Sequence, residues 1–229
     1  MYNHHVLIDF ELGGDKMSLY LGKVHYWLFN KILWFEGLET EIIDLAKAEG
    51  LDIDNLSKKI NDKYGEQMPS LPLEQMIDIT NIHGWLQEKI KSSEGRMASW
   101  TTAVTNNNKE VTSKMENIYT SQGVKAAQEV KEKGIESKTA IDIFNSINDY
   151  ILDGMPCDRV NEVVTSEENI VAWKRRLCVH QDIWNNEQGD VSYFYKLRSL
   201  WIQSFVSKIN SNFEYIERED EMKVIIRKQ

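Results

Sequence analysis

The stretch GMPCDRVNEVVTSEENIVAWKRRLCVH, residues 154–180, decides the class of fold. Before it, apolar residues recur every three or four positions, as in helices; after Pro156 they alternate with polar ones. Residues 160–165 therefore predict a β-strand, residues 166–169 a polar turn, and residues 170–179 the returning strand. The region from Gly154 to Trp201 also holds both cysteines of the chain, and the rest is arranged around it.

Amphipathic helices are predicted on the N-terminal side of this hairpin. The first covers residues 18–49, with Ser18 as its N-cap and Gly50 as its stop. Further helices are expected over residues 51–64, 73–92, 109–133 and 137–152. The polar stretch 94–108 predicts a loop or a helix cap, and the alternation of Val6, Ile8 and Phe10 predicts a short edge strand or an ordered arm.

The C-terminal part repeats the pattern of hairpin and helix. Residues 190–210 predict a helix, and residues 213–217 and 222–227 predict a second hairpin. The predicted fold is therefore α+β, an N-terminal helical bundle followed by a small antiparallel sheet of two hairpins flanking a helix. We expect a helical region over residues 1–108 and an α+β domain over residues 109–229, or one compact unit of both.

The composition of the chain narrows the classes of function that we expect. The chain has 27 basic and 36 acidic side chains, a net charge of -9, which argues against binding the phosphate backbone of nucleic acids. No run of 18 uncharged apolar residues predicts a membrane span. Two cysteines without a secretory leader do not indicate a disulfide framework. We therefore expect a soluble cytoplasmic protein.

Sulfur, imidazole and carboxylate groups gather at the open end of the first predicted hairpin. Cys157 precedes its first strand, Cys178 and His180 share one face of the second strand, and Asp182 continues that face. Cys157, Cys178 and His180, with Asp182, predict a site for a divalent metal such as zinc.

The same residues allow a second chemistry and a plain structural role. Cys178 as a thiolate nucleophile, His180 as its base and Asp182 as the group that orients the imidazole would form a catalytic site. Alternate side chains of a strand lie about 7 Å apart, a spacing that favours metal ligation over this dyad. Buried cysteines that only fill the core are the third interpretation.

Aromatic and arginine side chains surround this region. Arg175, Arg176 and Arg198 are candidates to receive a ligand carboxylate in bidentate fashion. Aromatic clusters suit an apolar ligand, or else they fill the seam between sheet and helices. The aromatic residues concerned are Trp173, Trp184, Tyr193, Tyr195 and Trp201.

Several short motifs carry a resemblance to a known family. The runs GVKAA (123–127), DGMPCD (153–158) and RLC (176–178), with Gly134 and the hairpin 213–228, resemble the L-2-amino-thiazoline-4-carboxylic acid hydrolase-like family over roughly residues 119–228. That family is similar in turn to the small ligand-binding domains named after 4-vinyl reductase. The resemblance implies a pocket between a sheet and its helices, with Cys178 at the end of the second strand. Many relatives have further cysteines in the next helix and the last hairpin, where this chain has none.

Three hypotheses for function follow. The first is an enzyme, a hydrolase acting on C–N bonds of a small carboxylate-bearing molecule, with or without a divalent metal. The second is a non-catalytic small-molecule-binding or sensory module, with Trp173, Trp184, Tyr193 and Arg198 in contact with the ligand. The third is an interaction protein whose first long helix packs against a second copy to form a homodimer.

Overall fold

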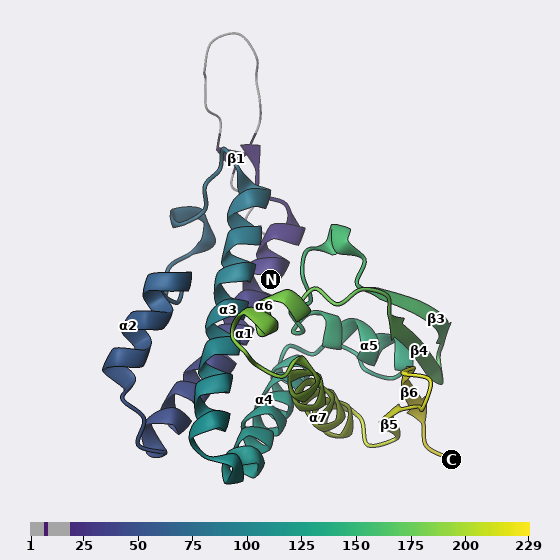
Figure 1. Cartoon of the computed structure of the whole chain (residues 1–229). Coiled ribbons are helices and arrows are strands. Elements are labelled where there is room, and N and C mark those ends of the chain that lie inside the picture. Colours follow the sequence, from purple (N-terminus) through teal and green to yellow (C-terminus); the bar gives the residue numbers. More distant parts are fainter. Residues whose placement is uncertain (1–6, 9–18) are drawn as a thin grey trace.

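The computed structural model describes residues 7–8 and 19–229. N-terminal helices are followed by a four-stranded antiparallel sheet, made of two hairpins with helix between them. Figure 1 shows the N-terminal helices on one side of the molecule and the sheet on the other. The predicted α+β fold is therefore confirmed. Ser18, Val6 and Phe10 lie outside the described residues, whereas Leu7–Ile8 (β1) pairs with Leu19–Tyr20 (β2).

Helix α1 (Lys23–Ala48) begins after Gly22 and not at residue 18 as predicted, because Leu19–Tyr20 form strand β2. Helix α2 (Ile53–Tyr64) lies where the spacing of apolar residues predicts it. The apolar stripe of α1 is buried inside the chain, with Leu28 only 2% exposed. Gly50, at a φ of 80°, follows α1 in the left-handed conformation that favours glycine. Asp52 caps α2 by accepting a hydrogen bond of 3.2 Å from the backbone N–H of Asn55.

Helix α3 (Ile82–Asn107) corrects two predictions, a helix over residues 73–92 and a loop or a helix cap over residues 94–108, of which only Asn108 caps, through the backbone N–H of Glu110. Residues Leu73–Gln75 form only a single 3₁₀ turn, η1. The helix begins after Asn81, and its residues 93–101 are buried, including Glu94 and Arg96. Because these charged side chains have partners inside the protein, the polarity of residues 94–108 does not mark a loop.

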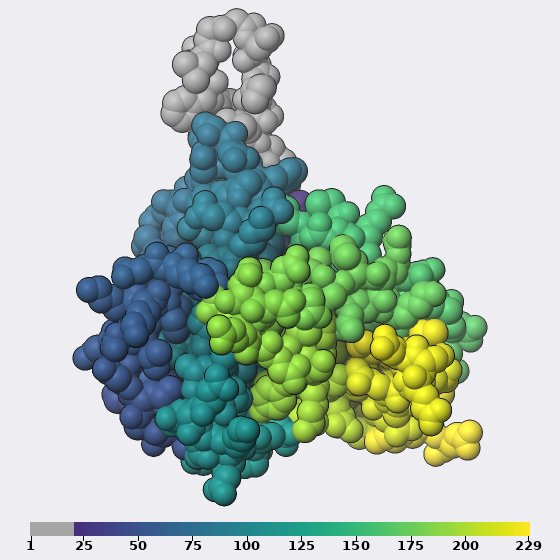
Figure 2. All heavy atoms as spheres, in the orientation of Figure 1, coloured from purple at the N-terminus to yellow at the C-terminus, as the bar shows by residue number. Residues whose placement is uncertain are grey.

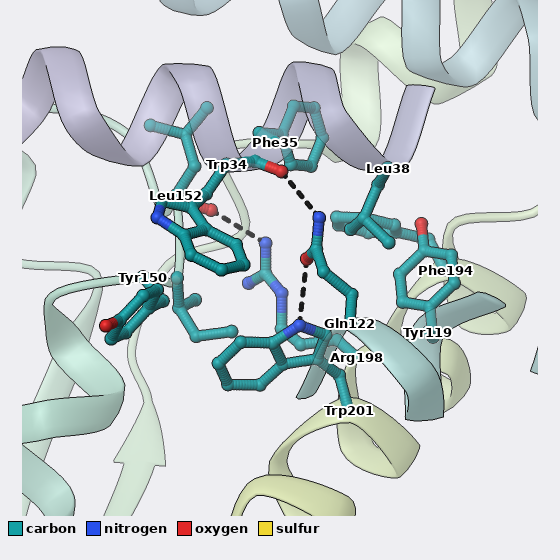
Figure 3. Close-up of a pocket in the computed structure, with 11 residues that line it drawn as sticks. Trp34, Phe35, Leu38, Tyr119, Gln122, Tyr150, Leu152, Phe194, Arg198 and Trp201 are labelled. Carbon is teal, nitrogen blue, oxygen red and sulfur yellow. Dashed lines mark hydrogen bonds between the residues drawn. The ribbon is translucent and has the colours of Figure 1, made fainter. Parts of the chain in front are cut away.

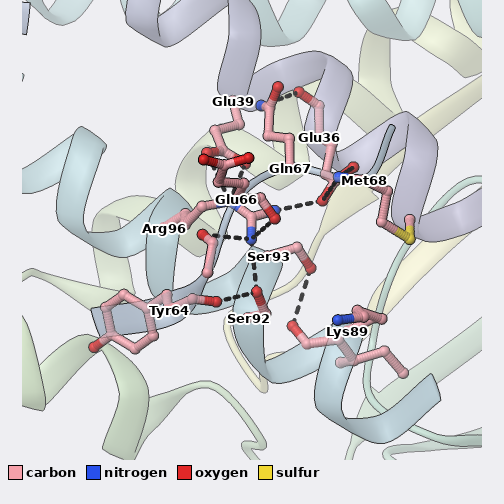
Figure 4. Close-up of polar contacts among 12 residues, drawn as sticks. Glu36, Glu39, Tyr64, Glu66, Gln67, Met68, Lys89, Ser92, Ser93 and Arg96 are labelled. Atoms are coloured by element: carbon pink, nitrogen blue, oxygen red, sulfur yellow. Dashed lines mark hydrogen bonds and ion pairs between the residues drawn. The ribbon is translucent and has the colours of Figure 1, made fainter. Parts of the chain in front are cut away.

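A buried charge cluster joins α1, α3 and the segment between α2 and η1 (Figure 4). Arg96 Nε donates to Glu39 at 2.9 Å, and the guanidinium also pairs with Glu36. Glu36 in turn accepts the backbone N–H of Met68 at 3.2 Å. Burial raises the pKa of both carboxyl groups, although Arg96 opposes this effect. Each charged group has a partner from the chain itself, so the cluster holds the helical layer together.

Two further helices, α4 (Thr112–Glu132) and α7 (Val191–Ile209), cross closely beside the N-terminal layer. A Cβ atom at Gly123 would overlap the carbonyl oxygen of Trp201 and the hydroxyl of Ser204. Asp190 caps α7 through a hydrogen bond of 2.8 Å from the backbone N–H of Ser192. The predicted helix over residues 109–133 corresponds to α4, which follows the short turn η2 (Lys109–Val111). The predicted helices over residues 137–152 and 190–210 correspond to α5 (Ala140–Asn148) and α7.

The sheet has the strand order β3-β4-β6-β5, with every neighbouring pair antiparallel. Its strands are β3 (Asn161–Glu167), β4 (Ile170–Arg175), β5 (Phe213–Glu217) and β6 (Lys223–Arg227). The prediction that the second strand reaches residue 179 is wrong. Arg175 pairs with Asn161 at the start of β3, and Trp173 pairs with Lys223 at the start of β6. Beyond Arg175 the chain pairs with no strand among the described residues, apart from a hydrogen bond from Arg176 to the carbonyl oxygen of Val160, and it enters a short unpredicted helix, α6 (Gln181–Asn186).

One cluster of buried apolar residues extends from Leu21 to Ile225. It includes residues of α1, α3, α4, α7 and the sheet, so the predicted regions 1–108 and 109–229 share a core. In Figure 2 the segment of α6 and α7 lies between the N-terminal helices and the C-terminal hairpin. Among the described residues, no helix combines the length and the apolar character needed to cross a membrane.

The close crossing of α4 and α7 yields a matched pair of substitutions. Gly123→Ala should lower the free energy of unfolding by about 1–3 kcal/mol, because the new methyl group has no space at the crossing. Gly37→Ala, on α1, meets only the amide nitrogen of Gln122 at 3.4 Å. This control should raise stability by about 0.5–1 kcal/mol through better helix propensity. Urea unfolding followed by tryptophan fluorescence measures both, and a loss of equal size in both variants would contradict the close crossing.

Candidate functional site

Arg198, on α7, lines two cavities. The sheet cavity lies between strands β3, β4 and β6 and helices α5 and α7, and the helix cavity lies between α1, α4 and α7. The sheet cavity is lined by Phe144, Ile147, Asn148, Ile151, Asp153, Asn161, Trp173, Arg175, Tyr195, Arg198, Ile202 and Lys223. The helix cavity is lined by Trp34, Phe35, Leu38, Tyr119, Gln122, Tyr150, Ile151, Leu152, Phe194, Arg198 and Trp201.

The helix cavity is aromatic, and its central polar side chain is satisfied (Figure 3). Gln122 donates to the carbonyl oxygen of Trp34 at 2.7 Å and accepts from Nε1 of Trp201 at 2.9 Å. The ring of Tyr150 meets that of Trp34 edge to face, with centroids 4.8 Å apart. The free volume is about 20 Å³, room for one or two water molecules at about 10–15 Å³ each.

A buried network of four charged side chains holds Arg198 between the cavities. His180, which has no exposed surface, places Nε2 3.0 Å from Asp153 Oδ1 and Nδ1 3.1 Å from Glu94 Oε1. Arg198 donates from Nη1 to the same oxygen of Asp153 and from Nη2 to the carbonyl of Leu152, both at 2.8 Å. The network therefore joins α3, the segment after α5, the start of α6 and α7.

The protonation states in this network follow from its contacts. Burial lowers the pKa of His180, but Glu94 and Asp153 outweigh it and raise that pKa overall. Burial likewise disfavours an ionised Asp153, yet Arg198 and His180 hold its pKa well below the usual range. Arg198, whose Nη2 lies 3.1 Å from His180 Nε2, opposes a charge on the imidazole, but the net shifts favour an imidazolium beside an ionised Asp153.

The predicted metal ligands do not gather. Cys157 is exposed in the turn η3 (Pro156–Asp158), Cys178 is half-buried between β4 and α6, and Asp182 is exposed in the first turn of α6. Within residues 7–8 and 19–229, no three His, Cys, Asp or Glu side chains form a group that could hold a metal ion. Because β4 ends at Arg175, Cys178 and His180 are not alternate residues of one strand, as the sequence predicts them to be.

Cys178 instead contacts Tyr195, and its sulfur lies 3.2 Å from the tyrosine hydroxyl. Burial raises the pKa of this thiol, but the hydrogen bond with Tyr195 and those from the backbone N–H groups of His180 and Gln181 outweigh it. The pKa of Cys178 is therefore lowered. The ring nitrogens of His180 face Glu94 and Asp153 rather than this thiol. The nucleophile–base hydrogen bond that a Cys–His dyad requires is thus not present among the described contacts.

Of the four predicted ligand-contacting residues, two line the sheet cavity and two do not. Trp173 and Arg198 line the sheet cavity. Trp184 instead stacks on Phe194, with ring centroids 5.0 Å apart, and neither Trp184 nor the half-buried Tyr193 lines either cavity.

Asp153 and Lys223 are lining residues that the sequence did not single out. Asp153 belongs to the DGMPCD motif, where the sequence gives it no separate role, and nothing local distinguishes Lys223 from a surface lysine.

The wall of the sheet cavity carries an excess of positive charge. Arg175 lies 3.7 Å from the centroid of the Tyr195 ring, and Lys223 lies on the neighbouring strand. In the part of the chain that the structure describes, neither side chain forms an ion pair or donates a side-chain hydrogen bond. Burial lowers the pKa of Lys223, Glu217 opposes this, and the charges of Arg175 and Arg198 lower it further.

Comparison with known proteins finds no match: no family model, no curated protein and no solved structure matches the chain. The chemistry of the site therefore follows from its own residues. These provide a positively charged wall, aromatic surface beside it, and a thiol behind Tyr195.

The charge network predicts a pH-dependent contribution of His180 to stability. Its raised folded-state pKa means that this contribution is complete below the unfolded value of about 6.5 and is lost as the pH rises through the folded value. His180→Gln should cost about 3–5 kcal/mol at pH 6, because two buried carboxylates lose a charged partner, and less at pH 9. Urea unfolding at several pH values measures the difference. His83→Gln, at an exposed position of α3, is the control, and a cost of His180→Gln that does not change with pH would contradict the charged network.

Proposed function

We propose that this protein binds a small carboxylate-bearing molecule in the sheet cavity. The observation that carries the proposal is the pair of cations without an anionic partner, Arg175 and Lys223, on the adjacent strands β4 and β6. A guanidinium receives a carboxylate through two parallel hydrogen bonds, and an ammonium adds a point charge. The proposed ligand supplies the negative charge that this wall lacks.

The arrangement of the strands brings the two cations to one face. Lys223 is directly opposite Trp173 in the antiparallel register. Arg175 follows Trp173 by two residues and therefore points to the same side of the sheet. Asn161, which pairs with Arg175, adds an amide to this face. Because Arg175 and Arg198 both repel the ammonium of Lys223, an anion between these groups would relieve a repulsion that already exists.

Size and lining indicate what kind of carboxylate fits. The free volume of the sheet cavity is about 30 Å³, room for about two or three water molecules. This space suits the ionic head of a ligand. Phe144, Trp173 and Tyr195 provide aromatic surface against which an apolar body can lie. The resemblance to the L-2-amino-thiazoline-4-carboxylic acid hydrolase-like family, which implies a pocket between sheet and helices, supports the same ligand class.

A second candidate function is hydrolysis of a C–N bond by Cys178. The observation that favours it is the contact of the thiol with Tyr195, whose side chain lines the sheet cavity, together with the lowered pKa of the thiol. The proposed binding function does not need this chemistry. It resembles the function of the non-catalytic domains named after 4-vinyl reductase.

Binding predicts a charge-specific ligand response. Phenylacetate should bind in isothermal titration calorimetry, and its neutral analogue phenylacetamide should not. Arg175→Met should weaken phenylacetate binding about 10-fold to 100-fold, as expected for the loss of a hydrogen bond between charged groups. Arg176→Met changes an exposed arginine that does not line the cavity and should leave the affinity unchanged. Equal effects of the two substitutions, or equal binding of acid and amide, would contradict the proposal.

Hydrolysis predicts a separate result. Wild-type protein should convert 2-amino-thiazoline-4-carboxylate with release of a titratable product, and Cys178→Ser should lose at least about 100-fold of that rate, since the nucleophilic thiolate is gone. Cys157→Ser, at the exposed cysteine, is the matched control. An unchanged rate in Cys178→Ser would exclude the thiol mechanism and leave the binding proposal intact.

A further inference from the structure

Two residues, Ile151 and Arg198, line both cavities. They therefore belong to the wall between the positively charged space beside the sheet and the aromatic space between α1, α4 and α7. The free volumes on the two sides are about 30 Å³ and about 20 Å³. If the wall were open, the two spaces would form one pocket with a charged end and an aromatic end. The wall thus decides how much room a ligand has.

The arginine part of this wall is held by its contacts. Arg198 donates from Nη1 to Asp153 Oδ1 and from Nη2 to the carbonyl oxygen of Leu152, both at 2.8 Å. Its guanidinium also lies 4.7 Å from the centroid of the Phe194 ring. Moving Arg198 aside would leave the carboxylate of Asp153 without this cation in a largely buried position, which is costly.

The isoleucine part is held by the backbone and by the shape of the side chain. Ile151 follows α5, and its N–H donates to the carbonyl oxygen of Ile147 at 3.1 Å. A β-branched side chain has few accessible χ1 rotamers, so Ile151 does not readily turn away. This side chain is entirely hydrocarbon. Shortening it would therefore open the wall without breaking an ion pair.

From this geometry we infer that Ile151 is a specificity-determining residue, which closes the aromatic helix cavity to the ligand and limits the protein to short carboxylates. The inference rests on the proposed binding function, in which Arg175 and Lys223 receive the carboxylate and Trp173 provides surface for a ring. An apolar extension of that ring gains no buried surface in the helix cavity while Ile151 stands between the two spaces.

Isothermal titration calorimetry with phenylacetate and 4-ethylphenylacetate tests the inference. The ethyl group adds two carbon atoms, which suits a helix cavity with room for one or two water molecules. Wild-type protein should bind the longer acid no more tightly than the shorter one. Ile151→Ala should bind the longer acid about 10-fold more tightly than wild-type protein does, as expected for the burial of two further carbon atoms. Ile151→Val, which disturbs the packing less, should show a smaller gain in the same direction.

Leu152→Ala is the matched control. This substitution also removes three carbon atoms, but Leu152 lines only the helix cavity. The wall stays closed, so the relative affinity for the two acids should remain that of wild-type protein.

The NMR signals of two indole N–H groups locate the ligand, because Trp173 lines only the sheet cavity and Trp201 only the helix cavity. Phenylacetate should shift the Trp173 signal in wild-type protein and in all three variants. The longer acid should shift the Trp201 signal only in Ile151→Ala and Ile151→Val.

The outcomes separate the inference from the binding function. If phenylacetate binds and shifts the Trp173 signal, but the longer acid gains no more in Ile151→Ala than in Leu152→Ala, the inference is overturned and the binding function stands. A Trp201 shift caused by the longer acid in wild-type protein would overturn it as well. Failure of wild-type protein to bind phenylacetate would contradict the binding function, and the inference with it.

Discussion

Charged side chains that are removed from water must be balanced by other charges, and this requirement organises the molecule at the junction of its helices and its sheet. Glu94 and Asp153 supply two negative charges there, and His180 and Arg198 supply two positive ones. Removing one member leaves another uncompensated, at a cost of several kcal/mol. Because the four residues come from distant segments, the network fixes α3 relative to α7 and to the chain that leaves the sheet. The N-terminal helices and the α+β region also share one core of buried apolar residues.

The same constraint explains how much of the fold the sequence predicts. Apolar periodicity and caps such as Asp52 and Asp190 place most helices and both hairpins, because these signals are local. The polarity of residues 94–108 predicts a loop or a helix cap, and most of this stretch is buried helix instead. Arg96, within this stretch, pairs with Glu39 and Glu36, which are 57 and 60 residues away in the sequence. Nothing in the local sequence indicates these partners. Burial of charge inside a helix is a property of the tertiary structure, and the pattern of one segment cannot show it.

The prediction that one strand carries both Cys178 and His180 is wrong for a related geometric reason. Alternation predicts that a strand begins, but the end of a strand depends on where its neighbours end. The pairing of β4 with β6 ends at Trp173 and that with β3 ends at Arg175, after which the N–H of Arg176 makes one last hydrogen bond, to the carbonyl oxygen of Val160. The chain then turns away, which removes Cys178 and His180 from a shared face and buries His180 between carboxylates. Trp173 and Arg198 were predicted as ligand contacts and do line the sheet cavity, since a residue in the middle of a strand or helix keeps its face when the ends shift.

Ion pairing also distinguishes the charged side chains that stabilise this fold from those that are free to bind a ligand. Arg198 is the arginine that the sequence favours for a ligand, yet Asp153 and the carbonyl of Leu152 already occupy its donors. A ligand carboxylate at Arg198 would have to compete with a buried ion pair. Its gain would be offset by the cost of leaving Asp153 without its guanidinium. Among the described residues Arg175 and Lys223 form no ion pair, so an anion that binds to them breaks none and reduces the repulsion along the cavity wall.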